Sequence, residues 1–426
     1  MRETTQLLLG RRWAGHSYNV NTTKKERIMS DNTFATVSRL AAGPAFTRVL
    51  RVLGPCLALL MLTQLPAYAD HIHHLWYNNI DWQDQDLTAK TNGGTATSGG
   101  GVAAFSTPGG QFHVYYVDST YSHLHQLYYN GHSWSDQDLT GLTGGPTAYP
   151  YNVSGFGVGN YQYVYYVGTD NHVHETYYVD NWTDIDLTAG LDANLASPIS
   201  LVAFSAPNGV IWVFYQDMNT LGDYVFNFNG SQWSYEAVNP IGAYCEAVWA
   251  SGFEEGSHGP YLFCPGYADS SQLNLLQFFQ EGGNAWWLED ITEAVNGAEL
   301  KLGTGTAGYK IGSGDFAVIE ETDDTHVHQY FAVRIRGEYD WADTDLTASY
   351  GAPADAYAGQ IVAFVTPGDQ QHIYYAPSTE VYQLYYNGSS WQVEDLTNGA
   401  GNADANSGMA AFPIGNKQHV FYMSNN

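Results

Sequence analysis

The chain has 426 residues, and its 43 acidic residues outnumber its 15 lysines and arginines. Residues 70–426 hold only six of the basic residues but 40 of the acids. Nucleic acid and anionic lipid surfaces are excluded as partners, because both are bound through clusters of Lys and Arg. The acidity supports solubility and says little about the fold.

The first 69 residues are typical of a secretory leader. Basic residues precede an apolar core at 52–65, and Ala67 and Ala69 form a small-x-small cleavage site before Asp70. Translation from Met29 would give a leader of more ordinary length. The apolar run is short for a transmembrane helix, so a membrane anchor is the less favoured alternative. We expect a secreted, extracellular or periplasmic protein with no membrane span once the leader is removed.

The rest of the chain repeats the motif Trp-x-x-x-Asp-Leu-Thr. Clear copies begin at Trp82, Trp134, Trp182, Trp341 and Trp391, and degenerate copies begin at Trp233 and at Trp286 or Trp287. Successive copies are 48–55 residues apart. A period of about 40–50 residues with several strand signals per repeat indicates a β-propeller.

Each repeat contains four strand signals, which residues 102–139 show in order. Segments rich in Val, Tyr and Phe at 102–105, 113–117 and 123–129 are followed by the motif strand at 134–139. Pro-Gly and Asn-Gly turns separate them, so they are expected to form consecutive hairpins. No part of 70–426 has a strong helical period, and we expect an almost pure β-structure.

The two ends of residues 70–426 complement each other. The N-terminal end supplies a third and a fourth strand, at 71–77 and 82–87. The C-terminal end supplies a first and a second strand, at 409–412 and 419–423. Together they predict a single all-β domain at 70–426, a propeller of seven four-stranded blades. Pairing of the N- and C-terminal strands in one blade closes the ring and removes exposed strand edges.

Two cysteines, Cys245 and Cys264, follow the leader on neighbouring expected strands. Export would place them in an oxidising compartment. We expect a disulfide between them, and two buried free thiols are the alternative.

Acidic residues recur beside the Leu-Thr of the motif. Four copies carry an Asp-x-Asp pair: Asp84/Asp86, Asp136/Asp138, Asp184/Asp186 and Asp343/Asp345. We expect these carboxylates to accept hydrogen bonds in turns and between blades. Calcium binding is the alternative, but the sequence has no typical calcium loop of several acids around a Gly.

Histidines recur on the third strand. The pairs are His71/His73, His123/His125, His172/His174 and His326/His328. Residues i and i+2 share one face of a strand, so each pair could chelate zinc. The pairs fall on different blades, however, and a closed site needs further ligands. We therefore expect a row of hydrogen-bonded histidines and no metal or other cofactor.

A polar residue, a His or aromatic residue and a Trp recur together in several blades. Such a set suits sugars, because a flat ring covers an apolar C–H face while planar polar groups bind hydroxyls. Several weak sites on one ring would add avidity. The predicted sugar-binding residues are His74, Trp82, His113, Gln126, Trp134, Tyr163, Glu175, Trp182, His372, Gln383, Trp391 and His419.

Three short motifs carry a resemblance to a known family. They are Val-Tyr-Tyr-Val, then His-x-His-Gln/Glu-x-Tyr-Tyr, then Asn-Gly-x-x-Trp, as in residues 114–134. They resemble the repeat of the fucose-binding β-propeller lectins of fungi and bacteria, among them seven-bladed bacterial lectins. The resemblance implies sugar contacts from an Arg on the second strand and a Glu on the third. In this chain the Arg position is occupied by His113, His372 and His419, and the Glu position by Glu175, Gln126, Gln329 and Gln383.

These features predict a non-catalytic, lectin-like propeller that binds glycans or glycoproteins. A protein-interaction or structural propeller is the alternative. A glycosidase or lyase is less favoured, because it needs one asymmetric set of carboxylates, and the acids here follow the repeat. The loop of Glu254, Glu255 and His258 is the least repeat-like acidic segment. A sialidase is disfavoured, since Arg334 and Arg336 cannot supply an arginine cluster.

Overall fold

The computed structural model describes residues 69–426 except 79, 207, 239–243, 246–249, 255–258, 269–271, 281–284, 313, 336–337, 355–360, 378, 398–407 and 425–426. The predicted leader therefore lies outside the described residues apart from Ala69, and so do Glu255 and His258. Ala67–Asn426 forms one compact unit. No helix among the described residues has the length and apolar character needed to cross a membrane.

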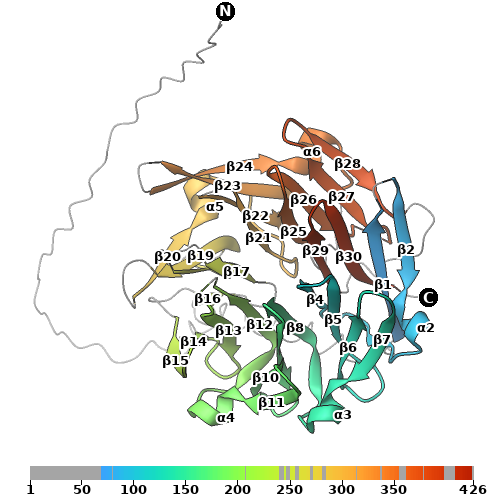
Figure 1. The fold of residues 1–426 in the computed structure, drawn as a ribbon. Coiled ribbons are helices and arrows are strands. Elements are labelled where there is room, and N and C mark those ends of the chain that lie inside the picture. The colour runs from blue at the N-terminus through green and yellow to red at the C-terminus, as the bar shows by residue number, and fades with distance from the viewer. Residues whose placement is uncertain are drawn as a thin grey trace, which may run out of the picture. The chain divides into compact units, whose positions relative to one another are not determined.

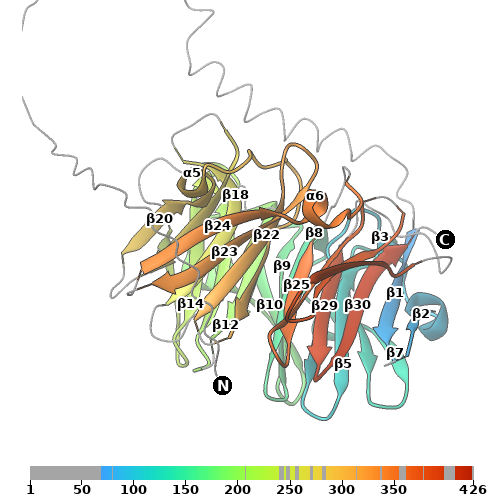
Figure 2. The ribbon, with the colours of Figure 1, turned by 90° about the horizontal axis from the view of Figure 1, so that it is seen from above.

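The described residues form seven antiparallel blades of four main strands, arranged in a ring (Figure 1). This confirms the predicted all-β, seven-bladed propeller. The blades are numbered here from the first one that is complete in the sequence. Seen from above, the hairpins of successive blades stand side by side (Figure 2).

The strands of each blade follow one another along the chain. Blade 1 contains β4 (Ala103–Thr107), β5 (Gln111–Val117), β6 (Leu124–Tyr129) and β7 (Trp134–Asp138); blade 2 contains β8 (Ala148–Val158), β9 (Tyr161–Gly168), β10 (Val173–Tyr178) and β11 (Trp182–Asp186); blade 3 contains β12 (Ala196–Ser205), β13 (Ile211–Asp217), β14 (Asp223–Phe228) and β15 (Trp233–Ala237). Blade 4 contains β17 (Ser251–Glu254), β18 (Pro260–Tyr267), β19 (Asn274–Gln280) and β20 (Trp286–Asp290), with β16 (Tyr244–Cys245) also paired to β18; blade 5 contains β21 (Ala307–Ile311), β22 (Asp315–Glu321), β23 (Val327–Ile335) and β24 (Glu338–Asp345); blade 6 contains β25 (Val362–Thr366), β26 (Gln370–Tyr375), β27 (Tyr382–Tyr386) and β28 (Trp391–Asp395).

Blade 7 joins the two ends of the described chain. It contains β29 (Met409–Ile414) and β30 (Lys417–Ser424), then β1 (Ala69–Tyr77) and β2 (Trp82–Asp86). β30 pairs with β1 in antiparallel register from His71↔Ser424 to Trp76↔His419. The short β3 (Ala96–Thr97) also pairs with the start of β1. The ring is thus closed through main-chain hydrogen bonds, as the ends of the sequence predicted.

The hydrophobic core is divided among the interfaces between blades. Each of seven clusters of buried apolar side chains in the described part of the chain joins two neighbouring blades. The second strand of a blade is buried on both faces, so every residue of β5 from Phe112 to Val117 is buried. In the outer strand β7 every side chain is partly or fully exposed. Period-2 alternation is therefore weak in the second strands, which read as continuous apolar runs.

Five short helices in the described part of the chain differ from the expected pure β-structure. They are α2 (Leu87–Thr91), α3 (Leu139–Thr143), α4 (Leu187–Leu191), α5 (Ile291–Val295) and α6 (Leu346–Tyr350). The last Asp of the outer strand caps each of them; in α3, Asp138 Oδ1 accepts a hydrogen bond from Gly141 N at 2.7 Å. The Leu of Leu-Thr is buried, and the Thr hydroxyl accepts the backbone N–H of the third strand, as Thr140 does from Leu124. One turn of helix has no 3.6-residue pattern, so periodicity could not reveal it.

Cys245 and Cys264 form a disulfide, with their Cα atoms 5.8 Å apart. The bond joins β16 to β18 within blade 4. Both residues are fully buried. The bond therefore fastens the segment before β17 to the second strand of its own blade.

Candidate sugar-binding slots between blades

Most of the predicted sugar-binding residues lie at the interfaces between blades. On each blade, one face of the second and third strands is turned toward the next blade. We call this region an inter-blade slot, and name it by its two blades. In slot 1/2, His113, Tyr115 and Gln126 of blade 1 face Gln162 and Trp182 of blade 2.

The polar residues of slot 1/2 are bonded to one another. The Gln126 amide nitrogen lies 2.7 Å from Gln162 Oε1, 2.8 Å from the Tyr115 hydroxyl and 2.9 Å from His113 Nδ1. His113 Nε2 lies 2.9 Å from the Thr107 hydroxyl. All five side chains are buried. The network satisfies the hydrogen-bonding groups that a sugar would otherwise engage.

Two further slots repeat this arrangement. In slot 6/7, the Gln383 amide nitrogen lies 2.6 Å from Gln418 Oε1 and 2.8 Å from His372 Nδ1. In slot 5/6, the Gln329 amide nitrogen lies 2.7 Å from Gln371 Oε1. In each of these slots, a glutamine of the following blade therefore accepts a hydrogen bond from the third-strand glutamine.

The histidines of slots 1/2 and 6/7 are neutral at pH 7. His113 is stacked between Phe105 and Tyr128, with ring centroids 5.3 Å apart on each side. Burial lowers its pKa to about 4. His372 is stacked in the same way and burial also lowers its pKa to about 4. An imidazole that stays neutral can bind an amide or a hydroxyl but does not supply the positive charge of an arginine.

Slot 7/1 contains two histidines that face each other. His74 Nε2 lies 3.0 Å from His419 Nδ1, and both rings are buried. Burial, with the adjacent His419, lowers the pKa of His74. Burial, with Lys417, lowers the pKa of His419 to about 4. The His74 ring also stacks on Phe421, with centroids 4.5 Å apart.

Slot 2/3 differs from the others because it contains a carboxylate. Glu175 is buried, and among the described residues its hydrogen-bond partner is the Tyr165 hydroxyl at 2.8 Å. At the position that Gln162 takes in slot 1/2, blade 3 has Ile211, whose apolar side chain cannot form a hydrogen bond with Glu175. Burial raises the pKa of Glu175 to about 7. The partly exposed rings of Tyr163, Tyr177 and Trp233 accompany it.

Three of the predicted tryptophans, Trp82, Trp134 and Trp182, pack between blades, and so does Trp233, which was not predicted as a sugar contact. Each begins an outer strand and meets a ring of the preceding blade nearly edge-on: Trp82 on Tyr374, Trp134 on Phe421, Trp182 on Tyr115 and Trp233 on Tyr165, with centroids 6.1–6.4 Å apart. These rings remain partly exposed, whereas Trp391 is buried in the cluster between blades 5 and 6. The four partly exposed rings stabilise the interface and also border the slots.

The His-x-His pairs lie at the opposite end of the third strand, beside the short helices. We call this region the helix end of a blade. In blade 1, His123 Nδ1 lies 2.9 Å from Asp138, and His125 Nδ1 lies 2.9 Å from Asp136. Blades 2, 5 and 7 repeat both pairs. In blades 2 and 5 a loop aspartate joins them, and these are the described residues that could hold a metal.

The structure thus places most of the predicted polar residues in hydrogen-bonded networks, and it places Glu175 in a slot without an amide partner. The sugar contacts predicted for them stay predictions. Sequence reasoning missed the glutamines Gln162, Gln371 and Gln418 that cross the slots. Each immediately precedes a second-strand residue that was singled out, namely Tyr163, His372 and His419. Aligning the repeats at that position would have revealed them.

A small cavity lies where the innermost strands of blades 2 to 6 meet. Its volume is about 140 Å³, and Asn152, Ser154, Thr306 and Ile361 are among its lining residues. Ligand pockets usually have volumes of about 300–1,000 Å³. The lining contains none of the predicted sugar-binding residues, so this cavity is not the proposed site.

Solved lectin structures resemble this fold. The BP39L lectin from Burkholderia pseudomallei matches with a TM-score of 0.58 and 14% identity over 74% of this chain and 88% of that chain. Aleuria aurantia lectin, a six-bladed β-propeller with a fucose recognition mode, matches with a TM-score of 0.47 and 16% identity over 69% and 94%. AofleA from Arthrobotrys oligospora matches with a TM-score of 0.48 and 13% identity over 76% and 88%.

No protein-family model matches the sequence, and a search of curated proteins finds no match. At 14% identity, the likeness to the Burkholderia lectin shows the fold alone. The resemblance to propeller lectins that the repeat motifs predicted is confirmed at that level. Fold does not determine function, which has to be argued from the site.

Proposed function

We propose that this protein is a secreted, non-catalytic carbohydrate-binding propeller, and that slot 2/3 is its principal sugar site. The observation that carries the proposal is Glu175. It is a slot carboxylate with one hydrogen-bond partner among the described residues, where slots 1/2, 5/6 and 6/7 have an amide already bonded to the next blade. The lectin fold and the sequence resemblance support the same reading, since Glu175 stands at the glutamate position of that family.

The chemistry of slot 2/3 fits a neutral sugar. Above its pKa of about 7 the Glu175 side chain is a carboxylate, which only accepts hydrogen bonds, and sugar hydroxyls can donate to it in charge-assisted bonds. The partly exposed rings of Tyr163, Tyr177 and Trp233 offer flat faces for the C–H side of a pyranose. Binding sites of this kind combine aromatic walls with a few polar groups that fix orientation. The strongly acidic chain disfavours an anionic glycan.

Secretion belongs to the same proposal. The predicted leader supports it, and so does the Cys245–Cys264 disulfide, since such bonds persist in oxidising compartments. Glycans are abundant on the surfaces that a secreted protein meets.

A glycan array probed with the purified protein, with and without EDTA, tests the function. We expect binding to neutral glycans, and Glu175→Gln to weaken it about tenfold, which corresponds to about 1.4 kcal/mol for replacing a charge-assisted bond with a neutral one. Glu254→Gln is the matched control. Glu254 is a buried carboxylate of slot 3/4 that already accepts Trp212 Nε1–H at 3.1 Å, so its loss should leave sugar affinity unchanged.

The two variants separate the two parts of the proposal. No binding to any glycan would overturn the carbohydrate function and leave the protein-interaction or structural propeller. Binding that is equal in wild type and Glu175→Gln would keep the function and reject slot 2/3. Melting temperatures of both variants identify any loss that is due to unfolding.

A further inference from the structure

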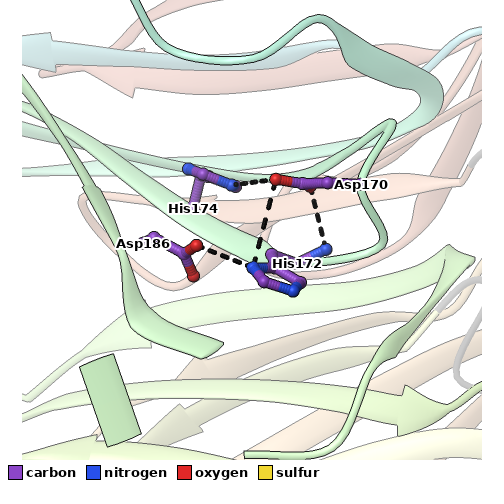
Figure 3. A group of neighbouring side chains, drawn as sticks. All are labelled: Asp170, His172, His174 and Asp186. Carbon is purple, nitrogen blue, oxygen red and sulfur yellow. Dashed lines mark hydrogen bonds and ion pairs between the residues drawn. The ribbon is translucent and has the colours of Figure 1, made fainter. Parts of the chain in front are cut away.

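At the helix end of blade 2, four potential metal ligands converge. Asp170 lies in the loop between β9 and β10, His172 immediately precedes β10, His174 lies near its start, and Asp186 ends β11 (Figure 3). One ligand atom from each residue lies within 4.8 Å of the other three. The four residues come from one blade, so no second blade is needed to complete the set.

The ligand atoms point toward one another. His172 Nδ1 lies 2.6 Å from Asp186 Oδ2 and 4.0 Å from Asp170 Oδ2. His174 Nε2 lies 3.3 Å from the same Asp170 oxygen (Figure 3). Asp170 is exposed, His172 is partly exposed and His174 is buried, so the group opens to solvent on the loop side.

Outer hydrogen bonds hold three of the four ligands in place. Asp184 bonds His174 Nδ1 at 2.9 Å, which leaves Nε2 directed into the group. The cap of α4 holds Asp186, because its Oδ1 accepts Ala189 N–H at 2.8 Å. Asp170 Oδ1 accepts the backbone N–H of His172 at 3.1 Å. Carboxylate–histidine–metal arrangements and bonded ligand carboxylates are the usual outer partners of metal sites.

Blade 5 repeats the group with Asp324, His326, His328 and Asp345. Asp343 bonds His328 Nδ1 at 2.8 Å, as Asp184 does in blade 2. His328 is 6% exposed, and its buried Nε2 has no hydrogen-bond partner within the described part of the chain. A buried ring nitrogen turned toward two carboxylates without a bond of its own indicates a missing ligand.

Blades 1 and 7 have the same His–Asp pairs, but the residues described in these blades supply no fourth ligand. In blade 1, Asp118 Oδ1 accepts His123 N–H, and its Oδ2 accepts the N–H groups of Thr120 and Tyr121. In blade 7, no loop joins β30 to β1. The paired histidines are therefore a general feature of the repeat, whereas the four-ligand group belongs to blades 2 and 5.

We propose that the helix ends of blades 2 and 5 each bind a divalent metal ion of the zinc class through two imidazole nitrogens and two aspartate oxygens. Mixed nitrogen and oxygen ligands suit zinc and its neighbours, whereas calcium and magnesium prefer oxygen alone. Ligand atoms of a tetrahedral site with bonds of about 2.0–2.1 Å are about 3.4 Å apart. Reaching that spacing requires Asp170 Oδ2 to approach His172 Nδ1, from which it is now 4.0 Å away, and Asp186 Oδ2 to separate from the same nitrogen, which it now contacts at 2.6 Å.

This proposal departs from the expectation of no metal. That expectation treated each histidine pair as incomplete because the pairs are on different blades. The loop aspartate, two residues before the first histidine, and the helix-capping aspartate complete the set within one blade.

Isothermal titration of the EDTA-treated protein with zinc chloride tests the proposal. We expect two equivalents to bind to wild type, one to Asp170→Asn and none to Asp170→Asn/Asp324→Asn. Asparagine keeps the oxygen that accepts His172 N–H, so the loop retains its turn while losing a charged ligand. His123→Gln removes the equivalent pair in blade 1 and should still bind two equivalents.

Thermal unfolding gives a second readout that does not depend on sugar binding. Zinc should raise the melting temperature of wild type and of His123→Gln but not that of the double variant, since a ligand that binds only the native state stabilises it. Calcium chloride at the same concentration should have no effect. Absence of zinc binding by wild type, or two equivalents retained by the double variant, would overturn the proposal.

Discussion

The inter-blade slots and the helix ends both contain recurring histidines, but the two regions treat them in opposite ways. In the slots, burial lowers the pKa values of His113, His372 and His419 to about 4. At the helix ends, burial also disfavours the charged ring, but hydrogen bonds and the charges of nearby aspartates raise the pKa of His125. The neighbours of the ring, amide or carboxylate, therefore decide whether the effect of burial on the pKa is offset.

This difference assigns distinct roles to the two regions. The slot histidines are neutral members of hydrogen-bond networks that join one blade to the next. The helix-end histidines lie beside carboxylates, which favour a positive charge, whether from a proton or from a metal. Each region should therefore respond to pH and to substitution in its own way.

The largest effect is expected from acid. His113, His372 and His419 each have a folded pKa of about 4, below the unfolded value of about 6.5, so the native state binds fewer protons in this range. Stability is then lost as the pH falls from about 6.5 to 4, by at most about 3 kcal/mol per histidine. Urea unfolding between pH 7 and 4 measures the loss, and His372→Gln should make it shallower. An equally steep loss in that variant would show that the ring is not held neutral.

Glu175 should give the opposite dependence within the slots. Its folded pKa of about 7 lies above the ordinary value of 4.5, so the native state binds more protons between these values. Stability should therefore fall as the pH rises from about 4.5 to 8, by on the order of 2–3 kcal/mol. Glu175→Gln should remove this loss. The free energy of unfolding of the variant, compared with that of wild type, should therefore be higher at pH 8 than at pH 5. Parallel urea curves for the two proteins at both pH values would contradict the assignment.

The amide networks should contribute to the stability of the fold. Gln126→Leu would leave His113 Nδ1 without its amide donor in a buried slot, at a cost of about 1–3 kcal/mol. Gln137→Leu is the matched control, because this glutamine pairs with Gln126 across β6 and β7 but is partly exposed. The control should change the free energy of unfolding by less than about 0.5 kcal/mol. Equal effects of the two substitutions would mean that the network is unimportant.

The smallest effect is expected at the helix end. Because the pKa of His125 is raised, its stabilising charge is fully present below about pH 6.5 and is lost as the pH rises through the folded pKa. His125→Gln should therefore lose stability relative to wild type at pH 5.5 and less at pH 9. His372→Gln should show the reverse trend. The same trend in both variants would remove the distinction between the two regions.

The repeat motif was sufficient to predict the architecture. Trp spacing indicated the blades, and the matching strand signals at 71–87 and 409–423 predicted ring closure, which β1 and β30 confirm. The five short helices were missed because one turn carries no periodic signal. Their capping aspartates were visible, but Asp-Leu-Thr after a strand suits a turn equally well.

The site was harder to predict because its contacts cross from blade to blade. The sequence identified Gln126 and Glu175 as equivalent positions. It could not show that Gln126 would form a hydrogen bond with Gln162, 36 residues away. Nor could it show that Ile211, at the equivalent position of blade 3, would leave Glu175 without an amide partner. By contrast, Asp170 and Asp324 each lie two residues before a His-x-His pair, so the metal-ligand groups could have been read from the loop sequence.

The proposal that slot 2/3 binds sugar is tested by the sugar affinity of wild type, Glu175→Gln and Glu254→Gln, measured on the glycans that the array selects. Only the substitution in slot 2/3 should weaken binding, by about tenfold, while all three proteins keep the same fold. Unchanged affinity in Glu175→Gln would reject slot 2/3 as the sugar site. No affinity for any glycan in wild type would reject the carbohydrate function itself.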